Sequence, residues 1–559
     1  MIPSDFQPWW QAGVLRPIRE SPQHITIDVN SLIIDTLRYS AQVRTISDNA
    51  IIAETSITRA AAEFDVRGFM ETKLVRTSVP TGSTLEAGVD VARLREEDWF
   101  YRAGFRKKNT FGGRFEFAQK IGSKESNSEF FLPAQQGNSR LTLSYNQPLL
   151  NGAGEAYNSS LILLADVDTR VAANRTAVEL QDQLLEVTQS MWELYVQRSL
   201  LLQKRRHLER ATLIHNRLVK RRHVDSLGSQ IARAGAAVAM RRTELIRAGT
   251  SIRNAEAFLR ALVNSPAMLS DRRRELVPIQ TPLSYFVPVD LEDALLTAIQ
   301  NRPDIDAAAQ EIEAARIRLD MARSELLPVL DAVLETYVSG LRGEFNIGRS
   351  FIDQFSMGEP SFTAGFVFEA PIHGRTARAN HLRRQVELRQ LSNKFQVAIQ
   401  TLNADVEVAV REVETTFREM QSKYQSMVAA ESDARYLQRR WESLPGDDRA
   451  ASFMLEDLLD SQDRLAGSEF EFTQSQADYT ISLTLLNRAT GTLLKHERIE
   501  LIRASDDCGV PMIVFEKTGA APENLPPSQE RLRGPAGQPH DAEPNSYRSA
   551  GHSTGRTYR

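Results

Sequence analysis

The stretch LSNKFQVAIQTLNADVEVAVREVETTFREMQSKYQSM, residues 391–427, decides the fold class of this chain of 559 residues. Apolar or small residues recur in it every three or four positions, and ten such steps cover 36 residues. The resulting period of about 3.6 is that of a straight α-helix, whereas a supercoiled heptad seam repeats every 3.5 residues. These positions are Leu391, Phe395, Ile399, Leu402, Val406, Ala409, Val413, Phe417, Met420, Tyr424 and Met427. Because residues 377–443 contain no proline or glycine, the pattern predicts one helix about 100 Å long.

Three more long helices are expected around this one. Residues 155–223 carry a matching apolar pattern, and residues 230–263 and 450–494 are expected to be the helices that return from two turns. The turns lie at 224–229 and 444–448, where glycine, proline, serine and aspartate gather. The sequence therefore predicts an α+β protein, mainly α, built on two long helical hairpins.

An internal repeat organises the chain. Residues 29–75 resemble residues 291–338 at an offset of 262, and residues 144–152 resemble residues 367–374. Each unit is expected to run helix, strand, strand, long helix, long helix. The expected divisions are an N-terminal extension (1–30), a first repeat (31–265), a proline-containing linker (266–290), a second repeat (291–494) and a mostly disordered C-terminal tail (495–559).

The expected strands alternate between apolar and polar residues. In 140–147, Leu141, Leu143 and Tyr145 oppose Arg140, Thr142, Ser144 and Asn146, and segments 64–75 and 362–369 alternate in the same way. Residues 329–338 are mixed. The first half carries an extra candidate hairpin, 99–107 and 114–121, which turns at Gly112-Gly113. Four segments, and this hairpin, are therefore candidates for a sheet with two different faces.

Composition excludes several classes of protein. Lys+Arg 68 against Asp+Glu 72 gives a net charge of −4, so no basic field points to a nucleic-acid partner. The single cysteine, Cys508, excludes an intramolecular disulfide and a multi-cysteine metal site. A mean hydropathy of −0.35 and 7% aromatic residues suit long solvated helices. No apolar run reaches 18 residues, so the sequence predicts no transmembrane helix and leaves a soluble protein or a β-barrel.

No catalytic, cofactor-binding or metal-ligating constellation is expected. Gly152-Ala153-Gly154 lacks the third glycine and the βαβ unit of a dinucleotide site. Histidines that recur every eight residues fan out around a helix, so they are interpreted as solvated rather than as ligands. They are His207, His215 and His223. The carboxylates around Asp457 are interpreted as a solvated helix face.

Several short motifs resemble the outer-membrane efflux protein (TolC) family. They are Asn301-Arg302-Pro303-Asp304-Ile305, Ala322-Arg323-Ser324-Glu325-Leu326-Leu327-Pro328, Pro371-Ile372-His373-Gly374-Arg375, Leu458-Leu459-Asp460-Ser461-Gln462 and Leu485-Leu486-Asn487-Arg488-Ala489-Thr490-Gly491. Each motif is weak alone, but their order, spacing and duplication make the set specific, and the likeness covers about 30–494.

The resemblance implies a homotrimer. Its strands would form one outer-membrane β-barrel, four from each chain, and its helices a periplasmic α-barrel. Together they would make a passive exit duct for a tripartite efflux pump or a type I secretion system. The partners implied are a periplasmic adaptor protein, an inner-membrane pump and outer-membrane lipid. The alternative is a soluble or peripheral helical scaffold without a channel.

The start of the chain does not match an outer-membrane address. Residues 1–10 lack the basic start and apolar stretch of a secretory signal. A misplaced or trimmed start is the favoured interpretation, because alternating strands have no role in a cytoplasmic coiled coil.

The two helical turns are the candidate functional site, as periplasmic gate and adaptor-docking surface. Arginines and carboxylates gather there, and arginine–carboxylate bridges would hold a closed state, each worth about 1 kcal/mol when partly exposed. The alternative is that these charges only solvate the turns. The candidate residues are Arg221, Arg222, Asp225, Gly228, Arg439, Arg440, Gly446, Asp447 and Asp448.

Overall fold

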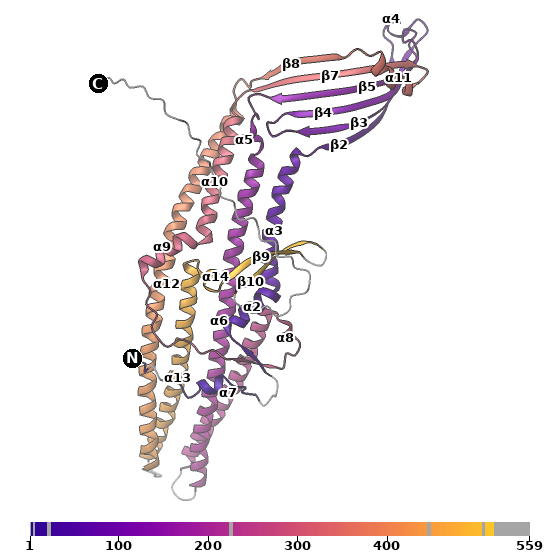
Figure 1. The fold of residues 1–559 in the computed structure, drawn as a ribbon. Coiled ribbons are helices and arrows are strands. Elements are labelled where there is room, and N and C mark those ends of the chain that lie inside the picture. Colours follow the sequence, from indigo (N-terminus) through magenta and orange to yellow (C-terminus); the bar gives the residue numbers. More distant parts are fainter. Residues whose placement is uncertain are drawn as a thin grey trace, which may run out of the picture.

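The computed structural model describes residues 2–3, 6–19, 24–222, 227–443, 449–505 and 509–518. The molecule is elongated, with long helices side by side and a sheet that projects from one end of them (Figure 1). Among the described residues, no helix combines the length and the apolar character needed to cross a bilayer.

The internal repeat is present in the structure. Helices α2 (Val29–Tyr39) and α3 (Ala41–Ala61) lead into strand β2, and α9 (Leu291–Asn301) and α10 (Pro303–Ser324) lead into β7. Asp28 caps α2 by accepting a hydrogen bond from the Ser31 backbone N–H, and Asp290 caps α9 in the same way from Asp293. These two caps stand at the sequence offset of 262 that relates the halves.

The long hairpins form as expected. The first consists of α5 (Glu155–Asn158), α6 (Ser160–Lys220) and α7 (Gly228–Val263), and the second of α12 (Arg375–Ser443) and α13 (Arg449–Ala489). Near the sheet the helices contact one another in the order α3, α6, α10, α12, and towards the tips in the order α7, α6, α13, α12. In the part of the chain that the structure describes, four helices therefore lie side by side at each level, and α6 and α12 run through both levels.

Within the described residues, the sheet has six strands instead of four. Its order is β2-β3-β4-β5-β7-β8, with antiparallel neighbours throughout. The strands are β2 (Arg67–Pro80), β3 (Arg93–Lys108), β4 (Arg114–Ser126), β5 (Gln135–Pro148), β7 (Val329–Gly343) and β8 (Ser361–Glu369). The extra hairpin β3–β4 is inserted between the two expected strands of the first repeat, so it is part of the same sheet.

The register gives the sheet an apolar and a polar face. Directly paired residues share a face. One ladder on the apolar face joins Phe105, Phe117, Leu143, Thr336 and Phe362, and one on the polar face joins Glu71, Arg102, Lys120, Arg140 and Ser339. The mixed segment 329–338 follows the same rule, because its partners place Leu334 and Val338 on the apolar face and Glu335 on the polar face.

The expected N-terminal extension and linker are parts of the fold. β1 (His24–Ile27) pairs in parallel with β6 (Glu275–Pro278), all four residues of which are buried. Two short helices flank them, α1 (Gln11–Val14) and α8 (Pro266–Leu269). Residues 266–290 connect the two repeats, and they also contain α8 and the buried β6, whose Leu276 belongs to a core cluster shared with α6.

The C-terminal segment 495–559, expected to be mostly disordered, contains regular structure at 499–505 and 511–517. After α14 (Leu493–His496), strands β9 (Ile499–Ser505) and β10 (Pro511–Lys517) form an antiparallel hairpin. Phe515 is buried with Ile33, Leu37 and Leu184, so the hairpin packs against the first repeat. Cys508 and the chain beyond 518 lie outside the described residues. The remaining short elements are η1 (Ala62–Phe64), α4 (Thr84–Ala87) and α11 (Ile347–Ser356).

Candidate functional site

The candidate residues at the tips lie where the long helices end. Arg221 and Arg222 follow α6, Gly228 begins α7, and Arg439 and Arg440 occupy the last turns of α12. All except the half-buried Arg221 are exposed. The remaining candidates, Asp225, Gly446, Asp447 and Asp448, lie outside the described residues, so the arginine–carboxylate latch stays a prediction.

The described part of the tips links the two hairpins of one chain. Arg217 at the end of α6 forms an ion pair with Glu442 of α12 (2.9 Å), and its guanidinium lies 5.6 Å from the centre of the Trp441 ring. Arg233 of α7 forms an ion pair with Glu456 of α13. Beneath these contacts lies an apolar cluster of Ile214, Leu218, Ala234, Trp441, Leu455, Leu458 and Leu459. The hairpins therefore meet through packed side chains as well as through charges.

A second link lies about two to three helical turns further from the tips. Asp463 of α13 accepts hydrogen bonds from His207 Nε2 (2.7 Å) and from the Arg241 guanidinium (2.9 Å). Arg241 also donates to Gln462 Oε1 and to the His207 and Leu459 carbonyls. The interpretation of His207 as a solvated histidine is wrong, because its side chain is buried between α6, α7 and α13.

The chemistry of this link favours a neutral histidine. Burial lowers the pKa of His207, and the hydrogen bond to Asp463 offsets that only in part. Burial alone would raise the pKa of Asp463, but the hydrogen bond from His207 and the charge of Arg241 hold it below its ordinary value. His207 Nδ1 is buried and meets no hydrogen-bond partner in the described part of the chain. A proton there would be a buried donor without an acceptor, so protonation strains the link.

The polar face of the sheet is rich in cations. Arg102 and Arg106 both bind Glu116. Lys120 lies over the Phe100 ring at 4.2 Å from its centre, and Arg140 lies over the Tyr337 ring at 3.4 Å. Aromatic faces attract cations, so these contacts hold the side chains against the sheet without neutralising their charge.

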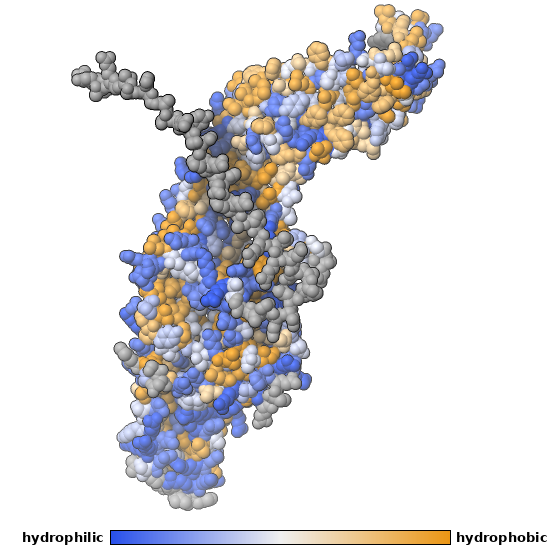
Figure 2. Space-filling view, viewed as in Figure 1, coloured by the Kyte–Doolittle hydropathy of each residue, from blue (hydrophilic) through white to orange (hydrophobic). Residues whose placement is uncertain are grey.

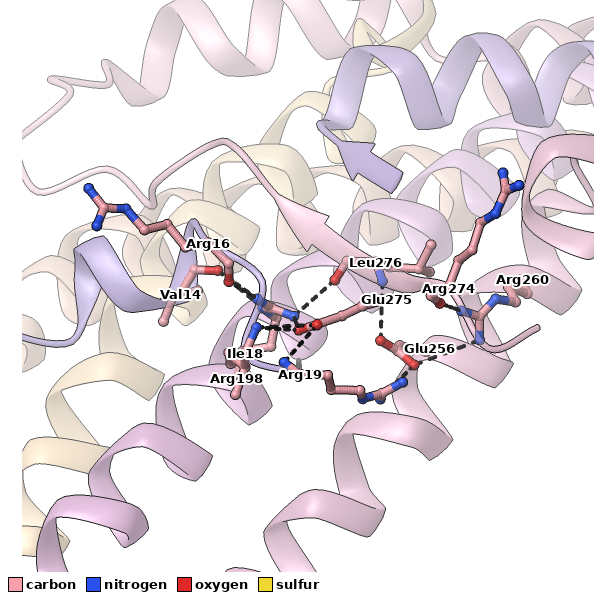
Figure 3. A network of polar contacts seen from close by, with 10 residues as sticks. All are labelled: Val14, Arg16, Ile18, Arg19, Arg198, Glu256, Arg260, Arg274, Glu275 and Leu276. Carbon is pink, nitrogen blue, oxygen red and sulfur yellow. Dashed lines mark hydrogen bonds and ion pairs between the residues drawn. The ribbon is translucent and has the colours of Figure 1, made fainter. Parts of the chain in front are cut away.

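A buried polar network fastens the N-terminal segment beside α6 (Figure 3). The Arg198 guanidinium, wholly inaccessible to solvent, binds the carbonyls of Val14, Arg16 and Leu276 and the Glu275 carboxylate. Five N–H···O contacts thereby use all five donors that a guanidinium possesses. The N-terminal segment, α6 and β6 are joined at this one side chain.

The Glu275 carboxylate of this network is held ionised by the same contacts. Glu275 accepts hydrogen bonds from the backbone N–H groups of Ile18 and Arg19 as well as from Arg198. Burial alone would raise the pKa of Glu275, but these donors hold it below its ordinary value. Glu256 accepts from the Leu276 N–H (3.2 Å) and pairs with Arg19 (3.0 Å), which extends the network to α7.

The motif at 301–305 is a junction between repeat elements. Arg302 binds Asp304 within the motif and Asp405 of α12 (3.1 Å). Gly491, which follows α13, has a φ of +70°, and a Cβ there would come within 2.6 Å of the Asn301 carbonyl oxygen. The glycine thus permits a turn and a close approach that a larger residue would prevent.

The described residues offer no evident site for a metal. In none of the described ranges do three His, Cys, Asp or Glu side chains converge as ligands. A crevice of about 530 Å³ lies between α3, α6 and α10 and is crossed by the Arg175–Glu311 ion pair (3.3 Å).

Sequence analysis missed the residues that join the hairpins. Arg217 and Glu442 are opposite charges within the last turn of α6 and of α12, and their position just before the two turns was the available signal. Glu456, interpreted as part of a solvated face, is half-exposed and also binds Arg233. For Arg198 there was no signal, because a lone arginine in a helix is ordinarily exposed.

Comparison with known proteins shows which family and which solved structures the chain resembles. Residues 294–492 match the family described as outer membrane efflux protein. No curated protein is significantly similar to the chain in sequence.

Solved structures of outer-membrane channels share the fold. The Campylobacter jejuni CmeC outer membrane channel is 12% identical, with a TM-score of 0.62 over 86% of this chain and 91% of that one. The outer membrane protein VceC from Vibrio cholerae is 15% identical, with a TM-score of 0.59 over 83% and 96%. The open state of the Neisseria gonorrhoeae MtrE outer membrane channel is 16% identical, with a TM-score of 0.59 over 88% and 98%.

Proposed function

We propose that this chain is one of three identical subunits of an outer-membrane exit duct. The proposal proceeds from the premise that residues 294–492 form an outer membrane efflux protein domain. The duct would serve a tripartite efflux pump or a type I secretion system. It would pass small molecules or polypeptides without doing chemistry on them.

The observation that carries this proposal is a two-faced sheet with two open edges. β2 and β8 are the edge strands, and each pairs with one neighbour in the described sheet. Open edges are not tolerated in lipid. Because six antiparallel strands alternate in direction, β8 of one copy and β2 of the next would also meet antiparallel. Six strands from each of three copies make eighteen, in place of the twelve expected from four-stranded subunits.

The helical wall supports lateral association of the same kind. α12 exposes Val386, Val397 and Val408 at intervals of eleven residues, which is about three helical turns. These valines form a stripe along one side of a helix that lies at the edge of its own subunit at both levels. A helix from a second copy would cover that stripe.

The polarity of each face of the sheet indicates whether lipid or water would surround it. Hydrophobic surface covers much of the strand region, whereas the opposite end of the molecule is mostly hydrophilic (Figure 2). The apolar face would contact outer-membrane lipid, the cationic polar face would line the lumen, and the helices would reach into the periplasm. There the tips would dock a periplasmic adaptor and, through it, an inner-membrane pump.

Planar-bilayer recording tests the proposal. Purified full-length protein should have the mass of a trimer in detergent by light scattering, and should conduct ions after insertion. Lys120→Glu on the polar face should shift the ion selectivity towards cations, whereas Arg205→Glu, a charge change on α6 remote from the sheet, should not shift it. A monomer, or a trimer that never conducts even after its tips are loosened by Arg217→Ala, would overturn the proposal.

A further inference from the structure

Helix α11 lies on the apolar face of the sheet, at the end remote from the long helices (Figure 1). It packs on β7 and β5 and touches β4. Its contacts include Gln119, Ser139 and Gly340, which the register places on the same face as Leu143. The helix is therefore on the outside of the proposed duct.

The polarity of α11 is the reverse of that of a helix packed on a core. Ser350 and Gln354 are completely buried against the sheet, whereas Phe351, Ile352 and Phe355 are 43%, 63% and 59% exposed. Ser350 Oγ donates to the Gly340 carbonyl (2.8 Å), and the Gln354 and Gln119 amides bind each other (3.2 Å). Polar groups hold the helix to the sheet, and its apolar groups are left outside.

Residues four apart share a stripe of a helix, and α11 has three stripes. Ser350 and Gln354 face the sheet, while Phe351 and Phe355 stack edge to face with ring centres 5.6 Å apart. The third stripe consists of the exposed Arg349 and of Asp353, which binds Arg342 of β7. Apolar and charged surfaces therefore lie side by side along a helix about 15 Å long.

Two glycines of the sheet make room for this helix. A Cβ at Gly340 would lie 2.0 Å from the Ser350 carbonyl oxygen, and a Cβ at Gly137 would lie 2.8 Å from the backbone of Asn346. The backbone of α11 thus rests directly on the backbone of β5 and β7. Its place on the sheet is fixed by the strands and does not depend on a partner.

We propose that α11 is an interfacial helix that lies in the outer leaflet of the membrane around the duct, with Phe351, Ile352 and Phe355 among the acyl chains and Arg349 at the headgroups. This inference rests on the proposed function. A short helix with adjacent apolar and charged stripes is the pattern that binds at the boundary between headgroups and acyl chains. The occupant is lipid because the apolar stripe continues the face of the sheet that carries Leu143.

A neighbouring subunit is the other occupant to consider. The edges at which copies would meet are β2 and β8, whereas α11 covers β5 and β7. Since β8 lies between β7 and that edge, a neighbour would have to reach across it to cover α11. The position of the helix therefore favours lipid.

Spin labelling distinguishes these surroundings. In a Cys508→Ser background, which removes the single native cysteine, nitroxides are attached at Phe355→Cys, Arg349→Cys or Leu143→Cys. The full-length trimer is reconstituted in phosphatidylcholine–phosphatidylglycerol vesicles. Collisions with oxygen, which concentrates in lipid, and with a water-soluble nickel chelate are then measured by power saturation.

We expect oxygen to dominate at 355 and 143 and the nickel chelate to dominate at 349. If the label at 355 meets nickel as readily as the label at 349 while 143 remains in lipid, α11 is in water and this inference falls alone. If 355 is shielded from both reagents, a protein surface covers it and the lipid assignment is equally wrong. If the label at 143 is itself exposed to nickel, the proposed membrane role of the sheet has failed, which is a separate result.

Discussion

The substitution Arg198→Met tests what fastens the N-terminal segment to the helices. Methionine has a similar length but no donors, so it leaves the buried Glu275 carboxylate without its cation and three carbonyls with fewer donors. Removing one partner of a buried ion pair costs about 3–5 kcal/mol. We expect a loss of that size in the free energy of unfolding, because Arg198 and Glu275 are both almost wholly inaccessible to solvent.

Hydrogen–deuterium exchange locates the loss. In Arg198→Met, amide exchange should rise in residues 6–19 and 275–278, the two segments that Arg198 joins, and should stay unchanged in β10. Arg19→Met is the matched control. The Arg19 side chain is one-third exposed, and in this variant its partner Glu256 keeps the hydrogen bond from the Leu276 N–H. We therefore expect a smaller loss of unfolding free energy than in Arg198→Met.

A double variant separates the cost of the unpaired charge from the loss of the other contacts. A buried charge left without its partner makes breaking an ion pair costly. Arg198→Met/Glu275→Gln removes that charge and keeps an acceptor for the Ile18 and Arg19 N–H groups, so it should be more stable than Arg198→Met alone, although the carbonyls remain unpaired. The reasoning is refuted if Arg198→Met lowers the unfolding free energy by under about 1 kcal/mol, the range of an exposed pair, or if exchange in 6–19 does not change.

Three further expectations follow from the faces, the buried histidine and the inserted hairpin. Leu143→Arg should destabilise the trimer in lipid by about 2–4 kcal/mol if the residue lies near the bilayer midplane, and should thereby lower its yield, whereas Arg140→Leu on the polar face should assemble normally. Equal yields of the two variants on gel filtration would invalidate the face assignment. Because the pKa of His207 is lowered in the folded state, the stability that the link contributes is complete above the ordinary histidine pKa of 6.5 and falls as the pH drops below that value. The midpoint of thermal unfolding should show this decline in the native chain and not in His207→Gln, and parallel curves of midpoint against pH for the two proteins would contradict it. Deleting residues 93–126 removes two neighbouring strands and leaves the remaining strands alternating in direction, so trimers should still form with a narrower barrel. The width is measured by the size of neutral polymers that can enter the lumen, and an unchanged size limit would count against this view.

The features that sequence alone could predict are local and periodic. The helix at 375–443 is predicted by apolar residues spaced three and four apart, and the strand at 140–147 is predicted by the alternation of apolar and polar residues. The repeat is visible because both halves carry the same pattern at the same offset. Such signals need no knowledge of what lies opposite each residue, so the long hairpins and the faces of the sheet followed from them.

The features that escaped prediction depend on partners far along the chain. β1 and β6 are four residues each and pair across some 250 positions, so neither has a period long enough to be read. The hairpin that ends in β10 has its apolar contacts on α2 and α3, which lie at the opposite end of the sequence. His207 and Asp463 become partners only when α6 meets α13. In each case tertiary packing decides what local composition leaves open.

The inserted hairpin has a consequence for where such a duct would be controlled. Barrel diameter grows with strand number, and barrels of 16–18 strands enclose an aqueous channel. Eighteen strands would therefore leave the membrane part open, while the helical wall keeps four helices per subunit at each level. We therefore expect control of the duct in the helical part. The tips are suited to it, because Arg217–Glu442 and Arg233–Glu456 join the two hairpins there. Exposed pairs of this kind are worth only about 1 kcal/mol or less each, so most of the cost of separating the hairpins comes from the apolar cluster beneath them, and binding of an adaptor would have to offset it.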